Sequence, residues 1–265
     1  MAVTKCEKEV EFKSVSRLLA RLNDRGLNVF PTHYKLEEFF KQAPALNAVI
    51  GLPGSDSTSP TAAALAAYTI ANKDFEVLGT GATTALATLA ADGGVTLTTG
   101  TSANDQMIIL PHLDTKQTAW TSTLWGTENQ TRFESWIKTG ASIADIVIWC
   151  GLKLTNTSVI ATNDDQAFFR FADADGTDWR LNTSRAGTDT LTTTGITVAA
   201  STLYRLAIEF DEVRGVKAFI NGTQVAQLPA MTDAIDLIPY IGVQTTTTAG
   251  KVITAKYLSC SRAAA

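Results

Sequence analysis

Three charged residues near position 210 come closest to a catalytic carboxylate pattern. Glycosidases use two carboxyl groups, one as an acid and the other as a base or nucleophile. Glu209 and Asp211 are two residues apart, so on a strand their side chains would share one face. The third carboxylate of a Glu-x-Asp-x-x-Glu pattern is replaced by Arg214, which cannot usefully donate a proton near neutral pH. We therefore expect Glu209 to lie on a solvated strand face, and we predict that the protein is not an enzyme.

Histidine is scarce, and this limits other kinds of catalysis. The sequence has two histidines, His33 and His112, which are far apart. A nucleophilic serine or cysteine needs an adjacent base, and a zinc site needs several His or Cys ligands. The sequence also lacks a His-Glu-x-x-His motif and the glycine-rich loops that hold phosphate. We expect no catalytic residue, no cofactor and no metal.

One acidic segment has some features of a calcium loop. Asp173, Asp175 and Asp178 are closely spaced, with Gly176 between them. An EF-hand needs flanking helices and a glutamate at its twelfth position, whereas strand patterns flank this segment. Asp175 followed by Gly176 is also a common hairpin turn. We interpret the segment as a turn, with a weak calcium site as the alternative, and residues 163–165 as another loop.

The tryptophans either fill a core or stack on sugar rings. There are five, at positions 120, 125, 136, 149 and 179. Large aromatic side chains contribute most to the burial inside a sandwich. We therefore expect Trp149 in the core and Trp136 packed between strands, and sugar stacking is the alternative.

The composition is that of a folded and weakly acidic protein. Of 265 residues, 45% are hydrophobic and 18% charged, which is enough apolar material for a core. The formal net charge of −4 does not favour nucleic-acid binding. No run approaches the roughly 18 apolar residues of a membrane span, and the charged N-terminus lacks the apolar region of a secretory signal. We expect a protein made in a cytoplasm, with neither nucleic acid nor membrane as a partner.

Two short helices are predicted before any strand. Each carries apolar residues at the spacing of one helix face, and the second follows Pro31 and stops before Pro44. Helices this short need a surface to pack on. We predict that residues 1–50 form a helical arm that serves as an interface; packing on the chain's own β domain is the alternative. The predicted interface residues are Val15, Leu18, Leu19, Leu22, Leu36, Phe39 and Phe40.

After a linker predicted for residues 51–73, the pattern changes to short strands. The clearest strand spans residues 204–210, where apolar and polar positions alternate. Asn221 followed by Gly222 predicts a two-residue hairpin. Cys150 and Cys260 fall in strand patterns, and we expect both to be buried. Further strands are predicted over residues 145–154, 167–172, 179–182, 216–220, 223–228, 239–243 and 251–259.

These strands resemble those of a known family of sandwiches. Residues 204–211 and the hairpin around Asn221 resemble the C-terminal half of concanavalin A-like (laminin-G-like) jelly rolls. The resemblance implies an antiparallel jelly-roll β-sandwich over residues 74–262, with a short tail at 263–265. The strings at 93–100, 104–112, 125–130 and 233–244 are similar to sandwich proteins carried on tailed double-stranded DNA phages.

The resemblance implies a structural component of a phage virion, assembled in the host cytoplasm. We expect a capsid decoration or cement protein, anchored by its N-terminal arm to the major capsid protein or another virion protein, and homo-oligomeric. The alternative is a carbohydrate-binding adhesin or tail-fibre-type host-recognition protein, whose partner would be a glycan on the host surface.

Overall fold

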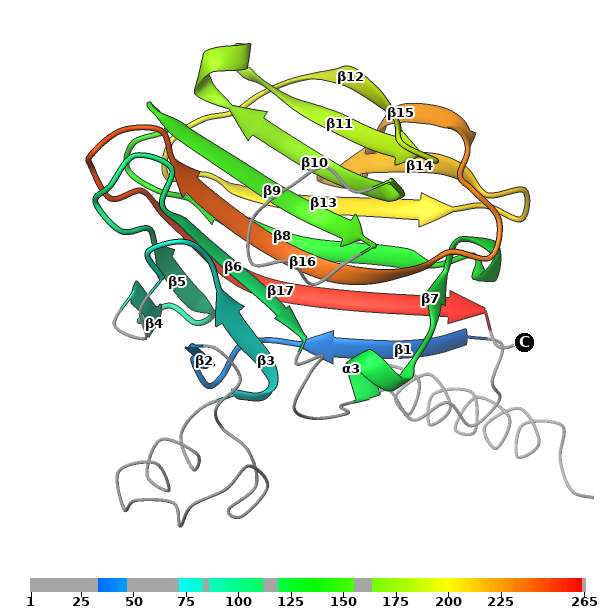
Figure 1. Cartoon of the computed structure of the whole chain (residues 1–265), viewed down its shortest axis with the longest axis horizontal. Helices are drawn as coiled ribbons and strands as arrows, with labels where there is room; N and C mark the ends of the chain where they lie inside the picture. The colour runs from blue at the N-terminus through cyan, green and yellow to red at the C-terminus, as the bar shows by residue number, and fades with distance from the viewer. Residues whose placement is uncertain (1–32, 47–71, 83–85, 112–118, 155–163, 264–265) are drawn as a thin grey trace, which may run out of the picture.

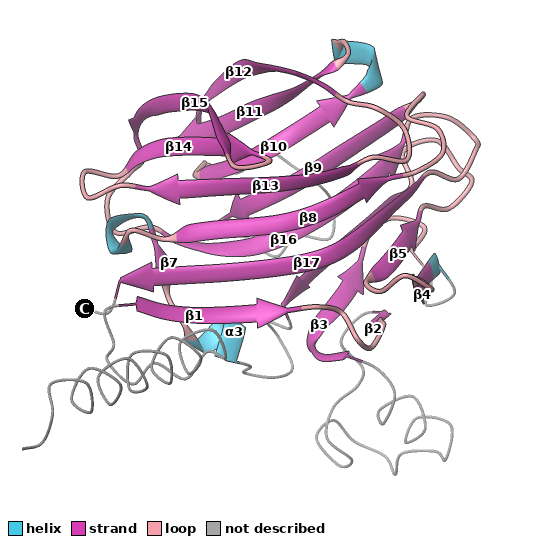
Figure 2. Ribbon diagram, turned by 180° about the vertical axis from the view of Figure 1, so that it is seen from behind, coloured by secondary structure: helices cyan, strands magenta, loops and turns pink. Residues whose placement is uncertain are grey.

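Two β-sheets packed face to face make up the protein (Figures 1 and 2). The computed structural model describes residues 33–46, 72–82, 86–111, 119–154 and 164–263. Neighbouring strands are antiparallel, except for one parallel pair at the edge of the second sheet. Together with the interleaved strand order, this arrangement is the jelly-roll sandwich predicted from the sequence.

The first sheet, sheet A, has eight strands in the described part of the chain. In spatial order they are β15 (Thr223–Ala230), β14 (Gly215–Ile220), β13 (Leu203–Phe210), β8 (Arg132–Thr139), β17 (Val252–Ala263), β5 (Val95–Thr98) and β4 (Ala87–Leu89). The eighth strand, β1 (His33–Glu38), pairs with the second half of β17, while β5 pairs with its first half. Figure 2 shows β1, β17, β8, β13 and β14 running side by side.

The second sheet, sheet B, has nine strands among the described residues. In spatial order they are β12 (Thr188–Thr197), β11 (Asp178–Arg185), β10 (Gln166–Ala172), β9 (Ile146–Lys153), β16 (Asp236–Thr245), β6 (Gln106–Pro111), β3 (Asn72–Leu78) and β2 (Pro44–Leu46), with β7 (Trp125–Gly126) paired to β16. Short helical turns are α3 (Ala119–Ser122), η2 (Thr127–Asn129) and η3 (Asp173–Asp175). In the described part, no helix is long and apolar enough to cross a bilayer.

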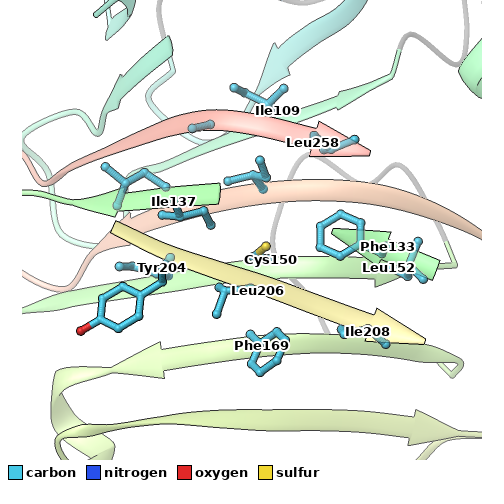
Figure 3. Close-up of a cluster of buried hydrophobic side chains, with 14 of the residues drawn as sticks. Ile109, Phe133, Ile137, Cys150, Leu152, Phe169, Tyr204, Leu206, Ile208 and Leu258 are labelled. Carbon is cyan, nitrogen blue, oxygen red and sulfur yellow. The ribbon is translucent and has the colours of Figure 1, made fainter. Parts of the chain in front are cut away.

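The core lies between the sheets because each strand turns alternate side chains inward. On β13 the four apolar positions predicted to share a face are all buried, led by Leu206 and Ile208 at 0% exposure. Figure 3 shows Leu206 and Ile208 close to Cys150, Leu152 and Phe169 of sheet B. Cys150 and Cys260 are both buried, as predicted, and burial raises the pKa of each thiol. The two thiols therefore act as small apolar side chains.

The predicted strands after residue 145 are confirmed as β9, β10, β11, β13, β14, β15, β16 and β17. The predicted hairpin is also confirmed. Asn221 has φ 52° and Gly222 has φ 85°, and a two-residue turn with both central φ values positive matches the twist of the strands β14 and β15 that it joins.

The second predicted helix was wrong. Its residues form β1, in which Leu36 is opposite Cys260 of β17 and packs against the core. Phe40 has φ 48°, and this turn places its fully buried ring 5.4 Å from that of Phe75. The apolar spacing fits a helix equally well, but a lone short helix is only marginally stable, whereas the strand is hydrogen-bonded to β17 and buries Leu36 against the core. Only Phe39 of the three predicted interface residues is exposed, at 48%.

The first predicted helix, with Val15, Leu18, Leu19 and Leu22, lies outside the described residues, so its interface role stays a prediction. The proposed arm of residues 1–50 nevertheless includes β1 and β2, and these strands belong to the sandwich.

Two leucines on one strand allow a matched test of the core. Leu206→Ala on β13 is expected to lower the free energy of unfolding by about 2–5 kcal/mol, because a fully buried side chain leaves a cavity. Leu203→Ala, on the same strand but 43% exposed, is expected to cost less than about 0.5 kcal/mol. Urea denaturation of both variants measures this, and equal costs would contradict the assigned register.

Candidate functional site

The candidate site is the outer face of sheet A, where the side chains that alternate with the core residues point away from it. Strand register arranges them in rows across the sheet. The first row runs from Lys217 on β14 through Glu209, Arg132 and Ser261 to Lys35 on β1. It is the most charged of the rows, with cations and carboxylates next to one another.

The second row has large side chains at its ends and small ones beside its centre. Phe219 on β14 is followed by Ala207, Glu134, Ser259 and Glu37. Because a small alanine and a small serine flank Glu134, no large side chain of this row lies directly beside the central carboxylate.

The third row is aromatic. The guanidinium of Arg205 lies 4.4 Å from the centroid of the Trp136 ring, and the rings of Trp136 and Tyr257 are 5.0 Å apart. The exposed ring of Phe39 extends the row, 5.0 Å from that of Tyr257. These contacts form a ridge along one side of the charged rows, made of three aromatic rings with a guanidinium at one end. We call it the aromatic ridge (Arg205, Trp136, Tyr257 and Phe39).

A bulge in β17 places Tyr257 on this face. Ala255 and Lys256 precede it, and the pairing with β8 shifts by one residue so that Tyr257 is opposite Trp136. Strict alternation from Ala255, which points into the core, would turn Tyr257 inward as well. The bulge therefore directs its ring outward, as bulges do where a side chain must be re-aimed.

Two depressions hollow the face and meet at Arg132, which lines both of them. The larger has a volume of about 560 Å³ and the smaller one of about 280 Å³. The larger is lined by His33, Gln130, Arg132, Glu209, Phe210, Asp211, Glu212, Val213, Lys217 and Ser261. The smaller is lined by Arg132, Glu134, Arg205, Ala207, Phe219, Asn221 and Gly222. We call the two together the groove.

Arg132 holds the carboxylates of the groove in place. Its guanidinium forms an ion pair with Glu209 of the neighbouring strand, and its Nη2 lies 3.3 Å from Oε2 of Glu134. The other carboxylate oxygen of Glu134 accepts a hydrogen bond of 2.9 Å from the Trp136 indole nitrogen. A planar guanidinium that contacts two carboxylates fixes both, so the groove presents fixed oxygens.

The residues of the carboxylate motif are separated by the turn after β13. Glu209 points outward, as predicted, with its side chain 29% exposed. Asp211 follows the strand and accepts hydrogen bonds from the backbone N–H groups of Val213 (3.1 Å) and Gly215 (2.7 Å). Arg214 turns away and pairs with Asp233. Asp211 therefore stabilises a turn at the rim of the groove.

Tyr257 also donates a hydrogen bond to Glu37, at 2.5 Å between the two oxygens, and Lys35 lies 2.6 Å from the same carboxylate oxygen. Partial burial alone would raise the pKa of Glu37, but these two partners favour its charged form, and the net effect is a pKa below 4.5. Burial, followed by the contact with Glu37, raises the pKa of Tyr257. A hydrogen bond to the charged carboxylate of Glu37 therefore holds Tyr257 in place in the aromatic ridge.

Of the other sequence candidates in the described part of the chain, His33 lies at the groove and the acidic segment lies apart from it. Asp175 pairs with Arg170 near the 3₁₀ turn η3, and within the described ranges no group of three or more His, Cys, Asp or Glu could hold a metal ion. His33 lines the groove, whereas His112 is outside the described residues.

Trp149 is buried, as predicted, but on the outer face of sheet B, where it belongs to a second apolar cluster with Phe168 and Tyr240. Lys153 lies in the same region, with its nitrogen 5.3 Å from the centroid of the Tyr240 ring, and burial lowers its pKa to about 8. Trp136 is the partly exposed tryptophan of sheet A, and the remaining three are buried in the main core.

Sequence reasoning missed Arg132, Glu134 and Phe219. The first two lie in the stretch 132–138, where polar and apolar residues alternate. This alternation predicts a strand with one charged face, so the sequence contained a signal for both residues. Their meeting with Glu209 depends on which strands are neighbours, which the sequence does not specify.

Comparison with known proteins supports the fold. No protein-family model matches the chain, and no curated protein matches it either. A protein of unknown function from Shewanella oneidensis MR-1 is similar over 99% of this chain and 95% of that chain, with 12% identity and a TM-score of 0.56. Bacillus licheniformis β-glucanase is similar over 71% and 92%, with 10% identity and a TM-score of 0.51. Alginate lyase A1-II′, of polysaccharide lyase family 7, is similar over 73% and 96%, with 13% identity and a TM-score of 0.50.

The chain thus has the concanavalin A-like jelly-roll fold predicted from its sequence. Identities this low show the fold alone, and none of these similarities bears on a phage particle.

The prediction that the protein is not an enzyme must be corrected. It rested in part on the scarcity of histidine, but the same fold carries a β-glucanase and an alginate lyase. It also rested on one broken motif along a single strand. Catalytic groups need only meet in space, and Arg132, Glu134 and Glu209 meet across two strands.

The contact between Tyr257 and Glu37 predicts a pH-dependent stability. Because the pKa of Glu37 is lower in the folded protein, folded chains bind fewer protons than unfolded ones near that pKa, and acid reduces the stabilisation. The gap in the free energy of unfolding by which wild type exceeds Tyr257→Phe should be largest near neutral pH. It should shrink as the pH falls below about 4.5. Urea denaturation across this range measures the gap, and a gap that stayed constant into acid would contradict the assignment.

Proposed function

We propose that the protein binds a polysaccharide chain in the groove on the outer face of sheet A. The observation that carries this proposal is the pair of neighbouring depressions that share Arg132, which combine fixed carboxylate and guanidinium groups with apolar surface. Sugars present both hydroxyl groups and apolar C–H faces. A site for them needs hydrogen-bonding groups for the first and apolar or aromatic surface for the second.

The smaller depression offers the best-defined position for a sugar ring. Ala207 forms its floor, and Phe219, Arg205 and Glu134 stand around it. Because Glu134 is already held by Arg132 and Trp136, little side-chain freedom is lost when a hydroxyl group binds to it.

The fold supports the same proposal. The β-glucanase and the alginate lyase that share it are named for polysaccharides, and an elongated polymer suits a face with two neighbouring depressions. The carbohydrate-binding alternative drawn from the sequence is thus our leading proposal.

Cleavage of the bound chain is a second candidate. Glu134 and Glu209 project from adjacent strands toward the same guanidinium, and two carboxylates at a sugar-binding site are the groups that glycoside hydrolysis requires.

Two substitutions on the outer face test the proposed groove. Ala207→Leu fills the floor of the smaller depression and Phe219→Ala removes its wall, so each is expected to weaken polysaccharide binding at least about 10-fold, or about 1.4 kcal/mol. Leu203→Ala, exposed on β13 outside both depressions, is the matched control and should bind like wild type.

The measurement is a screen of immobilised polysaccharides followed by titration calorimetry, with the same mixtures assayed for new reducing ends. New reducing ends that disappear in Glu134→Gln or Glu209→Gln would support cleavage. Wild-type affinity in both groove variants would show that binding lies elsewhere.

We also propose that this domain is carried on a tailed-phage virion, where the groove would meet glycans of the host surface. Support comes from the phage-like sequence strings and not from the fold. In this proposal the stripe of Val15, Leu18, Leu19 and Leu22 anchors the protein to the major capsid protein or to another virion protein, or joins its copies into an oligomer.

Removing residues 1–32 separates anchoring from binding. This deletion takes away the stripe but keeps β1, whereas a deletion of residues 1–50 would also remove Phe40 from the core. The shortened protein is expected to lose affinity for phage particles that lack the protein and to keep its affinity for polysaccharide. Co-sedimentation with such particles measures this, and undiminished sedimentation would refute the anchoring role.

A further inference from the structure

We infer that the groove selects an uncharged polysaccharide over a polyuronate. The inference rests on the proposed polysaccharide binding and names its substrate class. Among its described lining residues, the groove carries three permanent cations and four carboxylates. With histidine neutral, its formal charge is therefore negative, which does not favour a polymer bearing one carboxylate on each sugar.

The cations of the groove are also engaged by groups of the protein. Arg132 contacts Glu209 and Glu134, and Lys217 lies 3.6 Å from Asp211. Arg205 forms no ion pair within the described residues, but its guanidinium rests on the Trp136 ring. Two of the three cations, Arg132 and Lys217, are therefore already paired with carboxylates of the protein, which leaves the N–H edge of Arg205 as the contact that a ligand carboxylate could make.

A polyuronate would have to replace these contacts. Each sugar carboxylate that approached Arg132 would come close to Glu134 and Glu209, and like charges at that range repel. Displacing either glutamate from the guanidinium would also give up a contact that holds the groove carboxylates in place. The hydroxyl groups of an uncharged sugar can instead donate hydrogen bonds to these same oxygens, and the ion pairs remain intact.

The apolar part of the groove favours the same class of ligand. Phe219 and Ala207 line the smaller depression with apolar surface, and the rings of Trp136 and Tyr257 follow beyond Arg205. Such surface suits the C–H faces of neutral sugars and gives nothing to a carboxylate.

The test compares uncharged with acidic polymers on the full-length protein. Mixed-linkage β-glucan, xylan and mannan stand for the first class, and alginate and polygalacturonate for the second. At least one uncharged polymer is expected to bind 10-fold or more tightly than either acidic one, with affinity nearly unchanged up to roughly 0.5 M salt because no net charge is neutralised. Tighter binding of an acidic polymer would overturn this inference and leave the proposed function standing. No binding to any polymer would overturn the proposed function itself.

A charge-removal variant tests the cause of the selection. In Glu134→Gln/Glu209→Gln the guanidinium of Arg132 loses both carboxylates, so affinity for polygalacturonate is expected to rise at least 10-fold. Asp92→Asn/Asp233→Asn changes the net charge equally at positions outside the groove, where the two aspartates pair with Lys256 and Arg214. No gain in the first variant, or an equal gain in the control, would show that the glutamates are not what excludes acidic chains. The wild-type comparison of polymers still decides the selectivity if the first variant fails to fold.

Discussion

The alternation of side chains along β8 and β13 is the constraint on which the rest of the structure depends. Leu206 and Ile208 face the core, while Arg205, Ala207 and Glu209 face the groove. Because the two sets share one backbone, a shift of register by one residue would exchange them. The free energy gained by burying the apolar set thus also fixes the positions of the groove residues.

Arg132 shows how the site is held once that register is set. The cation lies on the central strand and reaches a carboxylate on its own strand and another on the neighbouring strand. Partly exposed ion pairs contribute little to stability, and a geometric role suits them better. The bulge in β17 acts in a similar way, since it turns Tyr257 toward Trp136 at the cost of one irregular pair in the ladder.

Local patterns predicted much of this structure, and contacts between distant segments account for most of what was missed. Most strands after residue 145 were predictable because alternation and turn residues are local signals, as Asn221 and Gly222 illustrate. The exception is β12, a threonine-rich strand without a buried position, which was not predicted. β1 was not predictable, because the spacing of Leu36 and Phe40 fits either a helix or an extended strand, and a partner more than two hundred residues away decides between them. The groove was missed for the same reason, since Arg132 and Glu209 meet only through sheet order. The bulge at Tyr257 breaks the alternation on which the strand predictions relied.

The pairing of β1 with β17 has a geometric consequence. His33 is opposite Ala263, so the first and last described residues of the sandwich lie together at one corner (Figure 1). His33 also lines the larger depression. A tether fused at either end of the sandwich would therefore leave it from the corner next to the groove, and its length and bulk would govern how closely a large polymer can approach.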